Sequence, residues 1–230
     1  MKKVFYALII FATFSTLYAE KLQTKIDKSA YLEIMYGFGV MNFPQNGYIH
    51  EAQLRAFFPT SGIMHEILAR GTLSQNTKSH KIPSKYQGYE AEYRVGMRMD
   101  GQFDNMGMII GSAYIGLGYQ NLIQKFQHER RNSHFLYLPI GFWGEDTMGE
   151  GGGLMAIFKL RYGINTKMIF VDNYNNDEKL KGHFLFGGKI YLGVGVKVVD
   201  ILDIFAQAYF QYGVPIRNTR IYGIEAGLQF

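Results

Sequence analysis

One stretch of the sequence, Tyr89 to Asp100, alternates strictly between two kinds of residue. Its odd positions read Tyr, Ala, Tyr, Val, Met and Met, and its even positions read Glu, Glu, Arg, Gly, Arg and Asp. Successive side chains of a β-strand point to opposite faces, so a strand separates the two sets. The 3.6-residue period of a helix would mix them. The segment therefore predicts a strand with one apolar face and one charged face.

The last residues of the chain repeat this pattern. An apolar row is formed by Tyr222, Ile224, Ala226, Leu228 and Phe230, with polar residues or glycine between its members. Weaker alternation predicts further strands over 32–40, 51–58, 106–119, 133–143, 154–164, 184–197 and 204–212. The composition agrees, because 16% of the residues are aromatic and 27 are glycine. Tyr and Phe favour strands, while Gly serves turns and crowded positions.

These segments make nine strands, whereas a single-chain bacterial barrel has an even number. Segment 63–72 supplies a tenth, although its apolar positions also suit a short helix, and eight strands remain the alternative. Short inner turns then fall at 59–62, 100–104, 144–153 and 198–203. Longer outer loops fall at 42–47, 73–87, 120–132, 167–183 and 214–219. The sequence thus predicts an all-β fold, a single antiparallel up-and-down transmembrane β-barrel of ten strands.

The first residues predict export. A basic start, Met1-Lys2-Lys3, precedes an uncharged and mostly apolar run that ends at Ala19, and Glu20 begins a polar stretch. This is the pattern of a secretory signal peptide cleaved after Ala19; an uncleaved anchor would carry a longer apolar run. We expect a signal peptide over 1–19, a short periplasmic tail over 20–28 and a barrel over 29–230. The sequence contains no Cys, so disulfides do not stabilise the chain.

The sequence resembles the small outer-membrane β-barrel proteins of Gram-negative bacteria, of the OmpA-barrel-like kind. The features that carry the resemblance are the signal ending at Ala19, the terminal pattern Tyr222–Phe230, and the string Tyr137-Leu138-Pro139-Ile140-Gly141-Phe142. It is also similar to the Helicobacter-type outer-membrane proteins. The resemblance implies location in the outer membrane, contact with its lipid and lipopolysaccharide, and insertion by the assembly machinery, with the terminal row as the assembly signal. It implies no substrate.

On the alternation, one set of charged residues faces the lumen. The acids are Glu33, Glu51, Glu90, Glu92 and Glu225, and the bases are Arg55, Arg94, Arg98, Lys159, Arg161 and Lys189. A barrel of eight to ten strands is narrow enough to be filled by side chains. Unpaired charges there would each cost several kcal/mol, so we expect them to pair. The alternative is a narrow pore lined on one side by bases.

Other chemistry finds little support in the sequence. The absence of Cys and of close His ligand sets argues against zinc, and we expect no metal or cofactor. Ser133 and His134 are adjacent on a predicted strand and would point to opposite faces, which argues against a hydrolase pair. Residues 182–189 lack the phosphate-loop spacing. The formal charge of +5 is spread along the chain, which argues against nucleic-acid binding.

The sequence therefore favours a non-enzymatic outer-membrane barrel with a plugged lumen and a structural or surface-interaction role. The second hypothesis is a small pore for solutes, and the third is a lipid A-modifying enzyme. The basic run His128-Glu129-Arg130-Arg131 falls in a predicted outer loop, where it is suited to lipopolysaccharide phosphates. Any host or surface ligand is left open.

Overall fold

The computed structural model describes residues 30–42, 47–60, 62–76, 85–103, 107–125, 130–150, 157–174, 185–199, 202–213 and 219–230. They form ten strands. The strands are β1 (Tyr31–Asn42), β2 (Gly47–Thr60), β3 (Ile63–Asn76), β4 (Lys85–Phe103), β5 (Gly107–Lys125), β6 (Arg130–Glu150), β7 (Ile157–Tyr174), β8 (Leu185–Val199), β9 (Leu202–Tyr212) and β10 (Arg220–Gln229). The predicted signal peptide and tail, with the cleavage site at Ala19 and Glu20, lie outside the described residues.

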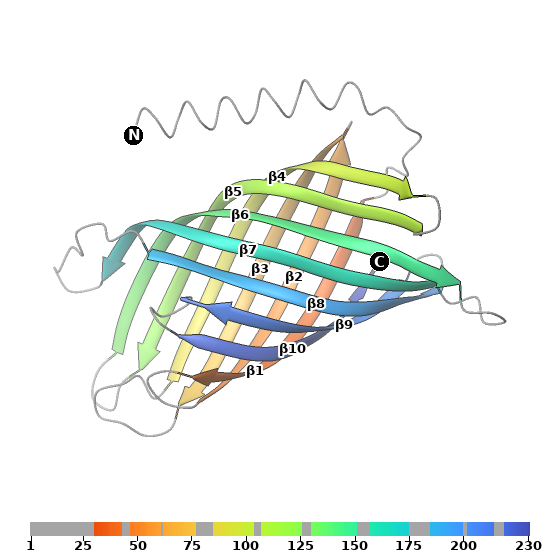
Figure 1. Ribbon diagram of the computed structural model, residues 1–230. Helices are drawn as coiled ribbons and strands as arrows, with labels where there is room; N and C mark the ends of the chain where they lie inside the picture. Colours follow the sequence, from red (N-terminus) through yellow and green to blue (C-terminus); the bar gives the residue numbers. More distant parts are fainter. Residues whose placement is uncertain are drawn as a thin grey trace.

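Each strand pairs antiparallel with its neighbour in sequence, and β1 also pairs with β10, which closes the barrel (Figure 1). The predicted all-β barrel of ten strands is confirmed. The alternative of eight strands is wrong, because Ile63–Asn76 is paired along its length with β2 and β4 and is not a helix. Gly62, with a φ of 86°, makes the tight turn before it.

The up-and-down order places the connections at two ends of the barrel. We call the end with connections 43–46, 77–84, 126–129, 175–184 and 214–218 the loop end. The turn end carries connections 61–62, 104–106, 151–156 and 200–201, together with Ala30 and Phe230. Long loops were predicted at 73–87, 120–132 and 167–183, and a long turn at 144–153. These bounds are wrong, because strands β3 to β7 extend into these four segments. The polar residues there continue the ladder of backbone pairing.

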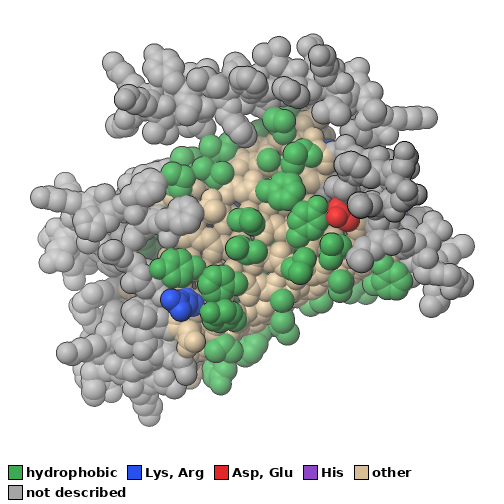
Figure 2. Space-filling model, viewed as in Figure 1, with side chains coloured by type: hydrophobic (Ala, Val, Ile, Leu, Met, Phe, Trp, Pro, Cys, Tyr) green, Lys and Arg blue, Asp and Glu red, His purple; other side chains and the backbone are tan. Residues whose placement is uncertain are grey.

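Burial alternates along the strands, so each strand has an interior and an exterior face. In β1 the odd positions from Glu33 to Met41 are buried, and the even positions between them are exposed. The exterior is apolar: Ile34, Ile67, Leu117, Leu192 and Ile224 are all about half exposed or more. Figure 2 shows hydrophobic side chains over the visible wall, with few charged ones among them. The polarity is inverted relative to a soluble protein, with charges inside and hydrocarbon outside.

The interior contains two apolar layers. One lies towards the loop end and consists of Met41, Ile49, Leu122, Phe135, Tyr137, Ile169, Tyr209 and Ile221. The other lies towards the turn end and consists of Phe57, Met64, Tyr114 and Trp143, with Tyr31 and Tyr191 packed against it. The run 133–143 looked apolar on both faces in the sequence, and the structure turns its odd-numbered aromatic residues inward. Buried charges occupy the space around and between these layers.

No helix among the described residues is long and apolar enough to cross a membrane.

Candidate functional site

The predicted lumen charges lie on the interior faces of their strands. Nine of them are buried: Glu33, Glu51, Arg55, Glu90, Glu92, Arg94, Arg161, Lys189 and Glu225. Lys159 is partly buried, with 17% of its side chain exposed, and Arg98 is partly buried on the interior face of β4. The alternation therefore assigned the correct face to every member of this set.

Five interior charges were missing from the prediction: Glu66, Arg70, Glu145, Lys167 and Asp203. The first two lie in β3, whose pattern also suited a helix. The other three lie in segments that were assigned to turns and loops. A signal for them existed, because each continues the alternation of its own strand. Lys167 has the same parity as Arg161 in β7, and Glu145 has the same parity as Tyr137 in β6.

The centre of the site is Glu33, whose side chain is fully buried. Its carboxylate lies 3.4 Å from Nη1 of Arg55 on the neighbouring strand β2 and forms an ion pair with Arg161 on β7. Strands β1 and β7 are not neighbours in the barrel wall, so the contact with Arg161 crosses the lumen. Arg55 continues to a second acid, with its Nε 3.2 Å from Oε1 of Glu66.

The contacts continue from Glu66 to the far wall. Nη1 of Arg94 lies 2.5 Å from Oε1 of Glu66, and Arg94 also pairs with Glu92 on its own strand. Lys167 of β7 then reaches across the lumen, with Nζ 3.6 Å from Glu92 and 2.6 Å from Glu90. Glu90 in turn lies 3.6 Å from Nη1 of Arg70. The lumen is thus crossed a second time, between β7 and β4.

In the other direction the contacts run towards the turn end. Nε of Arg161 lies 2.8 Å from Oε1 of Glu145, and Nζ of Lys159 lies 3.7 Å from Oε2 of the same carboxylate. Lys159 also forms an ion pair with Asp203 of β9.

Together these contacts form one chain of alternating charge, which we call the lumen network. Its order is Asp203, Lys159, Glu145, Arg161, Glu33, Arg55, Glu66, Arg94, Glu92, Lys167, Glu90 and Arg70. Acids and bases follow one another along it without exception. A buried charge that loses its partner costs several kcal/mol, and alternation gives every inner member an opposite charge on both sides. Such a chain fixes the side chains in the lumen.

A smaller cluster lies beside the lumen network. Lys189 of β8 pairs with Glu225 of β10 and lies 3.6 Å from Oε2 of Glu51 on β2. The amide of Gln207 donates a hydrogen bond of 2.7 Å to the other oxygen of Glu225. The ammonium of Lys189 also lies 4.1 Å from the centre of the Tyr209 ring, where the ring face attracts a cation.

Aromatic rings cover the arginines. The guanidinium of Arg161 lies 3.6 Å from the ring centre of Phe205, that of Arg55 lies 4.3 Å from Phe57, and that of Arg94 lies 4.6 Å from Tyr114. Guanidinium groups are weakly hydrated planar cations that stack on aromatic faces. The rings therefore fill the space that an open lumen would leave to water.

The layer towards the loop end joins the lumen network through Tyr137. This side chain is fully buried, and its hydroxyl donates a hydrogen bond of 2.7 Å to Oε1 of Glu92. Its ring lies against Gly118 of β5, where an added Cβ would come 2.3 Å from Cζ of the ring. Only glycine leaves room for the ring at this position. The Tyr137–Phe142 string thus contributes a ring that fills part of the lumen.

Little free space remains on the barrel axis. A cavity of about 30 Å³ is lined by residues from all ten strands, among them Met35, Tyr114, Trp143, Tyr191 and Gln207. A water molecule occupies roughly 30 Å³ of liquid volume, so the cavity is about the size of one water.

The remaining predicted residues have clear places. In β10, Tyr222, Ile224, Ala226 and Leu228 face outward, and the backbone of Phe230 exchanges two hydrogen bonds with Leu32, of 2.8 and 3.0 Å.

Ser133 is buried and His134 faces outward, where it shares a hydrogen bond of 2.5 Å with the hydroxyl of Tyr119. His128 and Glu129 lie outside the described residues. Among the residues described, no group of acids and histidines is arranged to hold a metal ion.

Comparison with known proteins returns barrels of the same class. No family model matches the sequence, and no curated protein sequence matches it. The transport unit of the autotransporter AIDA-I from Escherichia coli is 12% identical over 96% of this chain and 97% of that one, with a TM-score of 0.45. The translocator domain of the autotransporter NalP from Neisseria meningitidis is 7% identical over 100% and 97%, with a TM-score of 0.47. Neisserial surface protein A is 11% identical over 87% and 95%, with a TM-score of 0.39. The likeness concerns the barrel fold alone, and the resemblance to the Helicobacter-type family stays a prediction.

Proposed function

We propose that this protein is an outer-membrane β-barrel that spans the bilayer with its lumen closed, and that it serves the cell envelope through its wall and its loop end. The lumen network carries the proposal. A chain of paired charges that crosses the lumen twice, beside a cavity of only about 30 Å³, supports a closed lumen over the small pore. The alternative with an enzymatic role is a lipid-modifying activity.

The wall supports the membrane location. Outer-membrane barrels carry an apolar band flanked by aromatic residues at both interfaces. Here Tyr48, Tyr212 and Tyr222 are exposed near the loop end, whereas Phe58, Phe158 and Phe230 are exposed near the turn end. The strands have 10 to 21 residues, and a tilted strand needs about 9–11 to cross the hydrocarbon.

Three pairs of polar side chains on the wall are hydrogen-bonded, which suits a hydrocarbon environment. Three outward histidines each share a hydrogen bond with a tyrosine of the neighbouring strand. The pairs are His50 with Tyr36 at 2.6 Å, His65 with Tyr93 at 2.7 Å, and His134 with Tyr119 at 2.5 Å. An unpaired polar group facing lipid costs several kcal/mol, so these pairs favour a wall that meets lipid.

Conductance in planar bilayers tests the closed lumen. The refolded chain should insert without producing steady single-channel steps, at protein levels where a known porin does. Steady steps would contradict the closed lumen and favour the small pore.

Membrane fractionation tests the location. The protein should be recovered in the outer-membrane fraction, and its gel mobility should change on heating, as for folded barrels. Recovery in the soluble periplasm with unchanged mobility would contradict the membrane proposal. Incubation with lipopolysaccharide, followed by mass analysis of its acyl chains, tests the enzyme alternative.

A further inference from the structure

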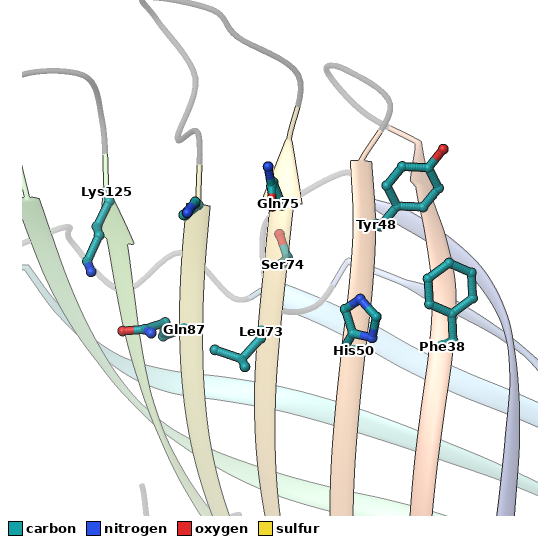
Figure 3. Close-up of a pocket in the computed structure, with 9 residues that line it drawn as sticks. Phe38, Tyr48, His50, Leu73, Ser74, Gln75, Gln87 and Lys125 are labelled. Carbon is teal, nitrogen blue, oxygen red and sulfur yellow. The ribbon is translucent and has the colours of Figure 1, made fainter.

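A pocket of about 520 Å³ lies on the wall at the loop end, lined by residues of the five neighbouring strands β1 to β5 (Figure 3). Nearly all of its lining positions belong to the exterior faces of their strands, including Phe38, His50, Leu73, Lys85 and Lys125. The pocket is therefore separate from the lumen network, and the closed lumen gives it no role.

The lining of the pocket is amphipathic. Phe38, Tyr48 and Leu73 supply exposed hydrocarbon and ring surface, and Leu73 alone is 54% exposed. Lys85 and Lys125 are paired strand residues at the loop end of β4 and β5, so both bases enter the lining from its loop end. The described lining residues include no acidic side chain. A lining with bases at its loop end and apolar side chains beside them matches a molecule with an anionic head and a hydrocarbon tail.

The wall continues from the pocket as a column of small residues. Gly71 pairs with Ala52 on β2, and Ala69 pairs with Ala91 on β4, all on the exterior face. A Cβ added at Gly71 would meet nothing within 4 Å. Large exposed side chains stand beside this column, Tyr89 and Tyr36 among them. The column is a shallow depression that leads from the pocket towards mid-wall.

We propose that the pocket binds a phosphorylated glycolipid of the outer leaflet, with its phosphate on Lys85 and Lys125 and one acyl chain along Leu73 and Gly71. This inference rests on the proposed membrane location with the loop end outward. Ammonium groups bind phosphate as strong charge-assisted donors. The small-residue column gives an extended acyl chain a place against the wall. A flat apolar wall would contact all lipids alike and would not select one of them.

Native mass spectrometry of lipid retained by the full barrel tests the proposal. The chain is refolded into nanodiscs of phosphatidylcholine with a minor fraction of lipid A, and then released. Lys85→Gln with Lys125→Gln should lower lipid A retention at least about tenfold, the factor expected from the loss of one charged contact. Gly71→Trp, which fills open space, should lower it as well. The matched controls are Arg220→Gln, an exposed base on β10, and Ala208→Trp, an exposed small residue on β9.

The lipid probes separate the parts of the ligand. Dephosphorylated lipid A with the same chains should be retained no better than phosphatidylcholine, and glucosamine 1-phosphate should not displace lipid A. Equal retention of the dephosphorylated form would overturn the role of the lysines. Displacement by the soluble head group would overturn the role of the acyl chain.

Two further results would also overturn the inference. Equal retention by all variants would identify the bound molecules as non-selective boundary lipid, and stronger retention of phosphatidylglycerol would identify a general anionic-lipid site. The proposed function fails separately: a chain without heat-modifiable mobility in bilayers contradicts the membrane barrel, whereas a folded barrel that retains no lipid A contradicts this inference alone.

Discussion

Replacing Glu33 by Gln removes one charge from the centre of the lumen network and keeps the size of the side chain. Arg55 and Arg161 both lose a carboxylate, although each keeps a second one. Glu66 remains 3.2 Å from Arg55, and Glu145 remains 2.8 Å from Arg161. Breaking a buried ion pair from one side costs about 3–5 kcal/mol. Since neither arginine is left without an acid, we expect the lower value, a loss of about 3 kcal/mol in the free energy of unfolding.

The single tryptophan of the chain makes the assay direct. Trp143 is 3% exposed inside the barrel, and its ring centre lies 5.4 Å from the guanidinium of Arg55. Its fluorescence during urea unfolding in lipid vesicles therefore reports on the lumen. Arg220→Gln, on the exterior, is the control and should change stability by less than about 0.5 kcal/mol.

A double variant separates lost charge from lost packing. Glu33→Gln combined with Arg161→Met removes both partners of one ion pair, while Glu145 keeps Lys159 at 3.7 Å. It should be less destabilised than the sum of the two single variants. The control should have a free energy of unfolding within about 0.5 kcal/mol of that of the parent. If Glu33→Gln does so too, the lumen charges do not stabilise one another as described.

Three further predictions concern export, assembly and the wall. Mass analysis of the membrane-embedded protein should give Glu20 as the first residue, and an intact Met1 would contradict cleavage after Ala19. Phe230→Asp should lower the outer-membrane yield, because it alters the predicted assembly signal while leaving the backbone bonds to Leu32 possible; an unchanged yield refutes that role. Val95→Arg, on the exterior face of β4, should cost about 2–4 kcal/mol near the bilayer midplane, against a Val95→Ala control, and a barrel as stable as that control would place this face away from lipid.

The alternation of side chains was enough to predict the strands because one face of each meets hydrocarbon. In Tyr89–Asp100 a shift of one residue would turn the charged side chains towards hydrocarbon, so the pattern is strict. Alternation gave nine of the ten strands, and the tenth, 63–72, was added because a single-chain barrel has an even number of strands. The strand ends were predicted too short, because beyond the apolar band both faces carry polar residues. The backbone pairing of the strands continues there, as in Glu145 to Glu150.

The partners inside the lumen could not be predicted from the sequence. Alternation gives the face of Glu33 but not its height relative to Arg161, which lies 128 residues away in the chain. That height depends on the stagger of the strands around the barrel, which accumulates from every register between β1 and β7. The packing of the Tyr137 ring in the lumen could not be predicted for the same reason, because it depends on the glycine opposite in β5.

The central claim, an inverted barrel whose exterior face meets lipid, is tested most directly on β9. The chain has no Cys, so single cysteines can be placed at Ala206 and Ala208, which are exposed, and at Phe205 and Gln207, which are buried. Each is labelled with a fluorophore before refolding into vesicles that contain a lipid-attached spin label. The account predicts strong quenching at 206 and 208 and weak quenching at 205 and 207. Equal quenching at all four positions, or the reverse pattern, would contradict it.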